Sequence, residues 1–240
     1  MTNQARSRPA ELAGVVSVAE DWNVARHKES AEEIIGSISP DLPFVLDAGT
    51  GMYLNAIVLD IQLAPKAPLE VRMEAERLAS GAENPRREAR RLELEALGSR
   101  ERSSIWDGSL LYDAVFVYVR PCKHSLDRSI SARSSMIVRD GVEEAITLKE
   151  SHTSPNASVR EAIGVKEMLL HVSGDIDAYK AEETIAVRTR RLARRQIRWF
   201  DKLACSVPDA ATRFVVLEQP SQNQCQKEKI VHLMHDIMQR

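Results

Sequence analysis

Aromatic residues, cysteines and long apolar runs are all scarce in this sequence of 240 residues. Aromatics are only 5% of the chain, which argues against binding clefts built from stacked rings. Three widely spaced cysteines, an odd number, favour reduced thiols in a cytoplasmic protein over a disulfide framework (Cys122, Cys205 and Cys225). Because no apolar run approaches the ~20 residues that span a bilayer, and no signal-peptide core follows the N-terminus, we expect no membrane partner.

The charge balance is also unremarkable, with 33 basic and 35 acidic side chains and a formal net charge of −2. This excludes a globally basic nucleic-acid coat, so any nucleic-acid site must be a local patch. The length and the 43% hydrophobic content suit one globular core with a small insertion. We expect the core to comprise 1–65 and 110–240, and the insertion to be the charged, helical 66–109.

The order of the expected elements indicates an α/β fold. A helix over 24–38 precedes a short apolar run at 43–47 that is typical of a buried strand. A glycine turn at 48–51 and a helix over 52–59 follow it, giving the strand, turn and helix of an α/β sheet. The rest of the chain predicts a strand at 113–119 and helices at 125–149, 158–172, 176–203 and 226–239.

The segment 188–200 (RTRRLARRQIRWF) has six arginines and no acid. On a helix, all six guanidinium groups fall within roughly 160° of arc, and the apolar side chains fill the opposite side. Such a face repels itself unless an anion lies opposite, and phosphate suits guanidinium best. The face therefore predicts RNA or phosphate binding that weakens with salt. The alternative is that acids from elsewhere in the fold neutralise it.

The glycine turn is a weaker signal. Gly49 and Gly51 would let the backbone approach a ligand, Thr50 adds a hydroxyl, and the following helix presents free N–H groups to an anion. The chain has no G-x-x-x-x-G-K-[ST] segment, so this turn is not a P-loop. A tight structural turn is an equally good reading of these residues.

Together these segments resemble the tRNA dimethylallyltransferase (isopentenyltransferase) family. That family carries GGTGLY after a strand, where this chain has AGTGMY, and T-R-x-L-A-K-R-Q-x-T-W-F, where 189–200 read TRRLARRQIRWF. AIGVKEML (162–169) resembles its A-I-G-Y-K-E-L, and 17–35 resembles the helix before the turn. In 130–141, Ile130, Arg133 and Gly141 match its I-x-x-R-x-x-x-M-x-x-x-G, with Ile137 in the Met position.

The departures from the family pattern concern catalysis. The family begins with a P-loop that grips the diphosphate of the donor, followed by an Asp thought to be the base, and this chain shows neither. The insertion is shorter than expected, and Asp47 and Ala48 replace the usual Val-Gly. The resemblance thus implies an incomplete P-loop NTPase-like parallel sheet with predominantly helical surroundings.

The family reaction transfers dimethylallyl from dimethylallyl diphosphate to N6 of the adenine adjacent to the anticodon of tRNA, and Mg²⁺ is implied with the donor. By resemblance, Lys166 would lie near the active site, although an ordinary surface lysine explains it equally well. The expected RNA-binding residues combine the turn, one residue of the insertion and the arginine-rich segment: Thr50, Arg72, Arg190, Arg191, Arg194, Arg195, Gln196, Arg198 and Trp199.

The missing P-loop and base lead us to expect little or no transferase activity from this polypeptide alone. A partner that supplies the P-loop would restore it, and a homodimer would cover the sheet edge that the missing first strand leaves exposed. The alternatives are a non-catalytic RNA-binding protein and a small-molecule adenylate prenyltransferase, and the all-arginine face argues against the latter. We expect no metal site at Cys225, His232 and His235, because their spacing is uneven and their number too small.

Overall fold

The computed structural model describes residues 10–39, 42–98, 104–106, 108–207 and 214–219. Its elements along the chain are α1 (Val24–Ser37), α2 (Gly51–Val58), α3 (Leu69–Ala79), α4 (Pro85–Ala96), β1 (Phe116–Pro121), α5 (Lys123–Asp140), α6 (Val142–Glu150), α7 (Ala157–Arg160), α8 (Val165–Val172), α9 (Ala178–Ser206) and β2 (Phe214–Gln219). The expected helices are confirmed as far as 206, although 125–149 divides at Gly141 and 158–172 divides into α7 and α8, with 161–164 not helical. The helix expected at 226–239, with Cys225, His232 and His235, lies outside the described residues.

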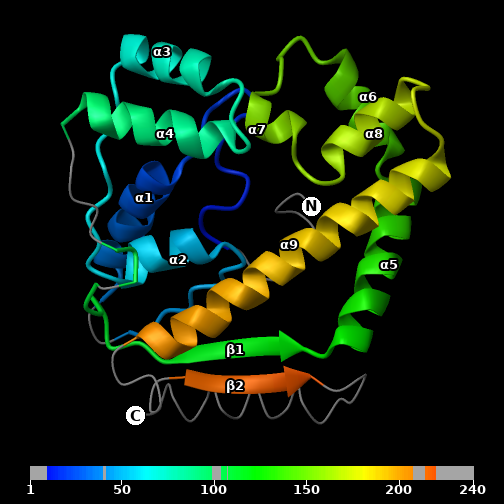
Figure 1. Cartoon of the computed structure of the whole chain (residues 1–240). Coiled ribbons are helices and arrows are strands. Elements are labelled where there is room, and N and C mark those ends of the chain that lie inside the picture. The colour runs from blue at the N-terminus through cyan, green and yellow to red at the C-terminus, as the bar shows by residue number, and fades with distance from the viewer. Residues whose placement is uncertain (1–9, 40–41, 99–103, 107, 208–213, 220–240) are drawn as a thin grey trace.

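The sheet is small and parallel, as expected. β1 pairs with β2 in a register that places Phe116 opposite Phe214, and their rings stack with centroids 4.5 Å apart. The strand expected at 113–119 begins at Phe116, three residues later than predicted. The helices α5 to α9 form the connection between the two parallel strands (Figure 1).

The prediction of a buried strand at 43–47 is wrong for the described structure. The segment is extended but carries no strand pairing, and Val45 is 64% exposed. A strand forms only where a neighbour takes up its N–H and C=O groups, and no described strand lies beside this segment. The apolar run Leu42–Leu46 is therefore left facing solvent.

The helix α9 belongs to two separate cores. Its C-terminal end contributes the fully buried Leu203 to a cluster with α1 and α2 that includes Ala31 and Ile57. Its N-terminal end contributes Ala181 and Ile185 to a cluster with α5, α6 and α8. At 29 residues the helix is about 44 Å long, so it links the two cores as one rigid element (Figure 1).

The expected insertion folds as two helices that pack on each other. The contact between α3 and α4 is built from small residues, with Ala75, Ala79 and Ala89 buried. The side-chain amide oxygen of Asn84 caps α4 by accepting from the backbone N–H of Arg87, and Pro85 occupies the first turn, where no N–H is needed. No helix in the described ranges is long and apolar enough to cross a bilayer.

Candidate nucleic-acid interface

The glycine turn lies directly against α9. The side-chain amide of Gln196 donates a hydrogen bond of 2.7 Å to the carbonyl of Gly49. A Cβ on Gly51 would lie 2.0 Å from Cδ1 of Trp199, so only glycine fits at this position. The turn and the arginine-rich segment, separated by 147 residues at the Gln196–Gly49 bond, thus form one continuous surface.

A fully buried amide fixes the same junction. Asn55 of α2 accepts a hydrogen bond of 3.3 Å from the indole N–H of Trp199 and donates one of 2.9 Å to the carbonyl of Ile105. The ring of Trp106 lies beside that of Trp199, with centroids 4.7 Å apart. The polar side-chain groups of Gln196 and Trp199 therefore bond within the protein, and these two residues fix the turn to α9.

Thr50 lies exposed at the start of α2. Its backbone carbonyl accepts hydrogen bonds from the N–H groups of Tyr53 and Leu54, while its side chain makes no capping bond. The hydroxyl is thus available to an outside group at a helix N-terminus, where backbone N–H groups favour anions.

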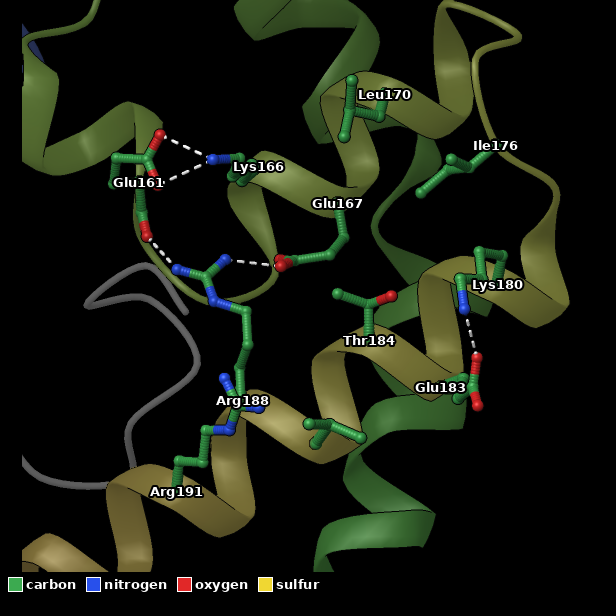
Figure 2. A pocket seen from close by; sticks show the side chains of 11 residues that line it. Glu161, Lys166, Glu167, Leu170, Ile176, Lys180, Glu183, Thr184, Arg188 and Arg191 are labelled. Carbon is green, nitrogen blue, oxygen red and sulfur yellow. Dashed lines mark hydrogen bonds and ion pairs between the residues drawn. The ribbon is translucent and has the colours of Figure 1, made fainter.

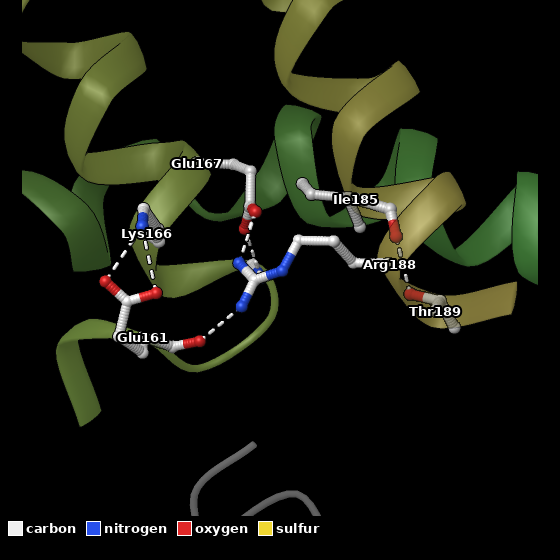
Figure 3. Close-up of polar contacts among 7 residues, drawn as sticks. Glu161, Lys166, Glu167, Ile185, Arg188 and Thr189 are labelled. Atoms are coloured by element: carbon white, nitrogen blue, oxygen red, sulfur yellow. Dashed lines mark hydrogen bonds and ion pairs between the residues drawn. The ribbon is translucent and has the colours of Figure 1, made fainter. Parts of the chain in front are cut away.

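Two of the six arginines of α9 have acidic partners within the protein. Arg188 pairs with the buried carboxylate of Glu167 and donates to the carbonyl of Glu161, and Arg190 pairs with Asp127 at 3.3 Å (Figure 3 for Arg188). These two side chains tie α9 to α8 and α5. The expectation of a wholly cationic face therefore fails at its N-terminal end.

The other four arginines have no carboxylate partner within the described residues. We call them the arginine stripe: Arg191, Arg194, Arg195 and Arg198, all exposed. Arg194 donates only to the backbone carbonyl of Arg190, at 3.4 Å. A row of exposed guanidinium groups without counterions attracts an external polyanion.

Lys166 lies at the beginning of α8, away from the glycine turn. Its ammonium group is 2.8 Å from a carboxylate oxygen of Glu161. That hydrogen bond lowers the pKa of Glu161, and the positive charges of Lys166 and Arg188 add to the effect. The two residues border a pocket of about 530 Å³ between α8 and α9, into which Glu167, Arg188 and Arg191 also face (Figure 2).

Glu167 is the centre of this polar cluster. Its side chain is 2% exposed and accepts both from Arg188 and from the backbone N–H of Gly164, at 2.8 Å for the latter. Gly164 has a φ of +94°, which other residues rarely adopt, so the AIG turn before α8 requires glycine here. Every described buried side-chain polar atom has a hydrogen-bond partner.

Arg72 is not brought to this surface by any described hydrogen bond or ion pair. It lies half-buried on α3, whose main packing partner is α4. Among the described residues, no three His, Cys, Asp or Glu side chains gather at one place. Magnesium that binds together with a diphosphate needs fewer protein ligands than this, so the Mg²⁺ that the resemblance implies stays an expectation.

Several residues of the interface escaped the sequence reasoning. Asn55 could have been found, because it is the single amide in the otherwise apolar run MYLNAIVL. Glu167 carries a weaker signal, as the one acid in α8. Asp127 and Trp106 carry no such signal, because their roles come from contacts with distant parts of the chain.

Comparison with known proteins identifies the family of this chain. The family model described as IPP transferase matches residues 2–96 and 75–203. The tRNA dimethylallyltransferase of Rubrobacter xylanophilus is 54% identical over 241 residues, covering 99% of this chain and 81% of the relative, and that of Phenylobacterium zucineum is 30% identical, covering 80% and 71%.

Solved structures show the same fold. The tRNA isopentenylpyrophosphate transferase of Bacillus halodurans superposes with a TM-score of 0.67 at 22% identity, covering 97% of this chain and 78% of the other. The corresponding protein of Staphylococcus epidermidis gives 0.62 at 19% identity, covering 93% and 80%. By the family model and the 54% identical relative together, this chain belongs to the IPP transferase family.

Proposed function

We propose that this chain binds tRNA along the arginine stripe and the adjoining glycine turn, as part of dimethylallyl transfer to N6 of the adenine adjacent to the anticodon. The observation that carries the proposal is the stripe itself: four exposed arginines without an acidic partner among the described residues, on the helix that holds the turn. The names of the curated relatives, all tRNA dimethylallyltransferases, support tRNA as the substrate and dimethylallyl diphosphate as the donor.

The chemistry explains why a cationic surface suits this reaction. The adenine N6 forms a bond to the first carbon of the dimethylallyl group, the carbon–oxygen bond to diphosphate breaks, and N6 loses a proton to a base. The adenine must leave its stack to reach the donor, so the RNA backbone has to be held on both sides of it. In this proposal the stripe holds that backbone, and Thr50 faces the RNA near the reacting adenine.

Lys166 and Arg72 have separate places in the proposal. Lys166, which the resemblance places near the active site, borders the pocket between α8 and α9 and is paired there with Glu161, so it would act as a further cation at a distance from the reacting adenine. Arg72, on the α3–α4 hairpin, would contact the RNA at a distance from the stripe.

We further propose that these 240 residues by themselves catalyse little or no transfer. They contain no G-x-x-x-x-G-K-[ST] segment for the diphosphate, and losing a single stabilising donor already costs about 10²–10³ in rate. RNA binding would then remain as the measurable activity of the isolated polypeptide. Mass spectrometry of tRNA incubated with this polypeptide, Mg²⁺ and dimethylallyl diphosphate tests this, and prenylated adenosine at an ordinary enzymatic rate would refute it.

A second chain is part of the same hypothesis. The apolar run 42–46 is exposed, so a homodimer, or a partner that supplies the diphosphate-binding segment, would bury it. Sedimentation of the purified chain, with and without Val45→Glu, tests the homodimer. If the native chain and Val45→Glu are both monomers, the homodimer is refuted and only the partner protein is left as a hypothesis.

The binding experiment separates RNA from small adenylates. Fluorescence anisotropy with a labelled anticodon stem-loop RNA, competed by unlabelled stem-loop or by AMP, should show competition by the RNA alone. The dissociation constant should rise steeply with salt, because each phosphate contact releases a counterion. Equal competition by AMP, or affinity independent of salt, would refute the proposal.

A further inference from the structure

The arginine stripe continues past Arg198 to a lysine that lies just beyond the arginine-rich segment 188–200. Lys202 follows Arg191, Arg195 and Arg198 at helical intervals of four, three and four residues. On an α-helix these positions lie within roughly 60° of one another and span about 17 Å along the axis. Like the three arginines, Lys202 is exposed and has no acidic partner among the described residues.

The acid nearest to Lys202 in sequence is engaged elsewhere. Asp201 accepts from the guanidinium of Arg120 at 3.2 Å and from the hydroxyl of Tyr118 at 3.2 Å, both on β1. It projects about 100° away from Lys202 around the helix. The positive charge of Lys202 is therefore not cancelled by its neighbour.

An aromatic ring holds the lysine in place. The ammonium nitrogen of Lys202 lies 4.5 Å from the centroid of Trp106, within the range of a cation–π interaction. The ring centroid of Trp106 lies 4.7 Å from that of Trp199, and the Trp199 ring packs directly against Gly51 of the glycine turn. A series of side-chain contacts thus connects the C-terminal end of the cationic row to the glycine turn, from Lys202 through Trp106 to Trp199.

We propose that Lys202 contacts a phosphate of the bound RNA and that Trp106 is its positioning residue. A lysine side chain loses much rotamer freedom when it is fixed on a ligand, and a side chain already held over a ring has less to lose. This inference rests on the proposed binding of tRNA along the arginine stripe. It extends that site by one helical turn, so that the RNA backbone runs from Arg191 to Lys202 and ends beside the glycine turn.

Lys202→Gln tests the contact. The labelled stem-loop should bind this variant roughly three- to tenfold more weakly at moderate salt, and the slope of log affinity against log salt should fall by about 0.7–0.9. Lys149→Gln, at an exposed lysine of α6 with no described partner, is the matched control and should change neither quantity. A Lys202→Gln variant that behaves like Lys149→Gln overturns the inference.

Trp106 requires a double-mutant cycle, because it also packs against Trp199. Trp106→Leu should weaken binding roughly two- to fivefold in the native background, but have no effect in the Lys202→Gln background. Trp106→Phe, which keeps a ring for the ammonium group, should restore most of the affinity. Equal weakening by Trp106→Leu in both backgrounds would mean that the ring acts through packing, and would refute its positioning role.

Arg195→Gln and Arg198→Gln distinguish this failure from failure of the proposed function. If neither lowers the salt slope, RNA does not lie along the stripe, and both proposals fall. If both lower it and Lys202→Gln does not, the RNA leaves α9 before Lys202, and only the present inference is lost. Thermal unfolding of each variant shows whether a loss of binding reflects a loss of fold.

Discussion

We divide α9 into an N-terminal half, 178–190, and a C-terminal half, 191–206. The arginines of the two halves carry the same charge but differ in what surrounds them. In the N-terminal half, Arg188 and Arg190 pair with Glu167 and Asp127 from neighbouring helices. In the C-terminal half, the arginine stripe has no acidic partner among the described residues. The chain has 35 acidic side chains, so a shortage of acids does not explain the difference. Placement of charge, more than its amount, therefore separates arginines that hold the fold from arginines that face a ligand.

The largest expected effect comes from breaking a pair in the N-terminal half. Arg188→Met leaves the carboxylate of Glu167, only 2% exposed, without its cation, so the free energy of unfolding should fall by about 3–5 kcal/mol. Arg195→Met, in the C-terminal half, should change it by less than about 0.5 kcal/mol. Urea denaturation of the two variants measures both, and similar losses would remove the distinction between the halves.

Removing charge from the C-terminal half should weaken RNA binding and leave the stability of the fold unchanged. The triple variant Arg191→Gln, Arg195→Gln, Arg198→Gln should lower affinity for the anticodon stem-loop by roughly a hundredfold and the salt slope by about two. Its unfolding free energy should stay near that of the native chain, because these side chains have no described acidic partner to lose. Arg190→Gln is the matched control, since its guanidinium is already paired with Asp127 and should contribute little to the slope.

Close packing fixes the glycine turn to the C-terminal half of α9. Gly51→Ala places a methyl group against the ring of Trp199, so it should cost about 1–3 kcal/mol of stability and also weaken RNA binding. Gly36→Ala, in α1 with no atom near the added Cβ, should be neutral or slightly stabilising. Thermal unfolding compares them, and a neutral Gly51→Ala would show that the turn and α9 are not in close contact.

The sequence was most informative where the pattern is local. The helical period of 176–203 and the glycine turn before α2 are visible in consecutive residues, and the structure has a helix over 178–206 and a helix that begins at Gly51. The arginine face is visible in the same way, but only four of its six arginines lack an acidic partner among the described residues. The partners of Arg188 and Arg190 were not visible, because Glu167 and Asp127 lie 21 and 63 residues away in the chain. A charge pattern on one helix indicates its exposed face only when no other element brings acids to it.

The strand error at 43–47 has a related cause. An apolar run between turn residues predicts burial, but a strand also needs a neighbour to pair with, and pairing is not encoded in the run itself. The described β2 was missed for the same reason: Phe214 and Val215 become a strand by pairing with β1. Family resemblance identified the turn and the arginine segment, but it did not show that Gln196 bonds to Gly49 or that Trp199 lies against Gly51.

The smallest expected effect concerns Lys166, which, like Arg188 and Arg190, is paired with an acid of the protein. Because the Lys166 hydrogen bond lowers the pKa of Glu161, Lys166→Gln should raise that pKa toward the ordinary value of 4.5. A carboxyl group whose pKa is lower in the folded state than in the unfolded state stabilises the fold at any pH above its unfolded pKa. This stabilisation is lost as the pH falls through the folded-state pKa. The free energies of unfolding of the native chain and of Lys166→Gln should therefore differ slightly near neutral pH and become equal in acid. The difference is small because an exposed ion pair contributes little to stability.

Carboxyl NMR titration of Glu161 measures this shift directly, with Arg195→Gln as a control that should leave it unchanged. Inorganic diphosphate adds a second readout, since an anion that draws Lys166 away from Glu161 should raise the carboxyl pKa in the native chain but not in Lys166→Gln. A diphosphate-sensitive titration would place Lys166 with the arginine stripe, as a cation available to a ligand. An insensitive one would place it with Arg188 and Arg190, as a cation whose partner is the protein itself.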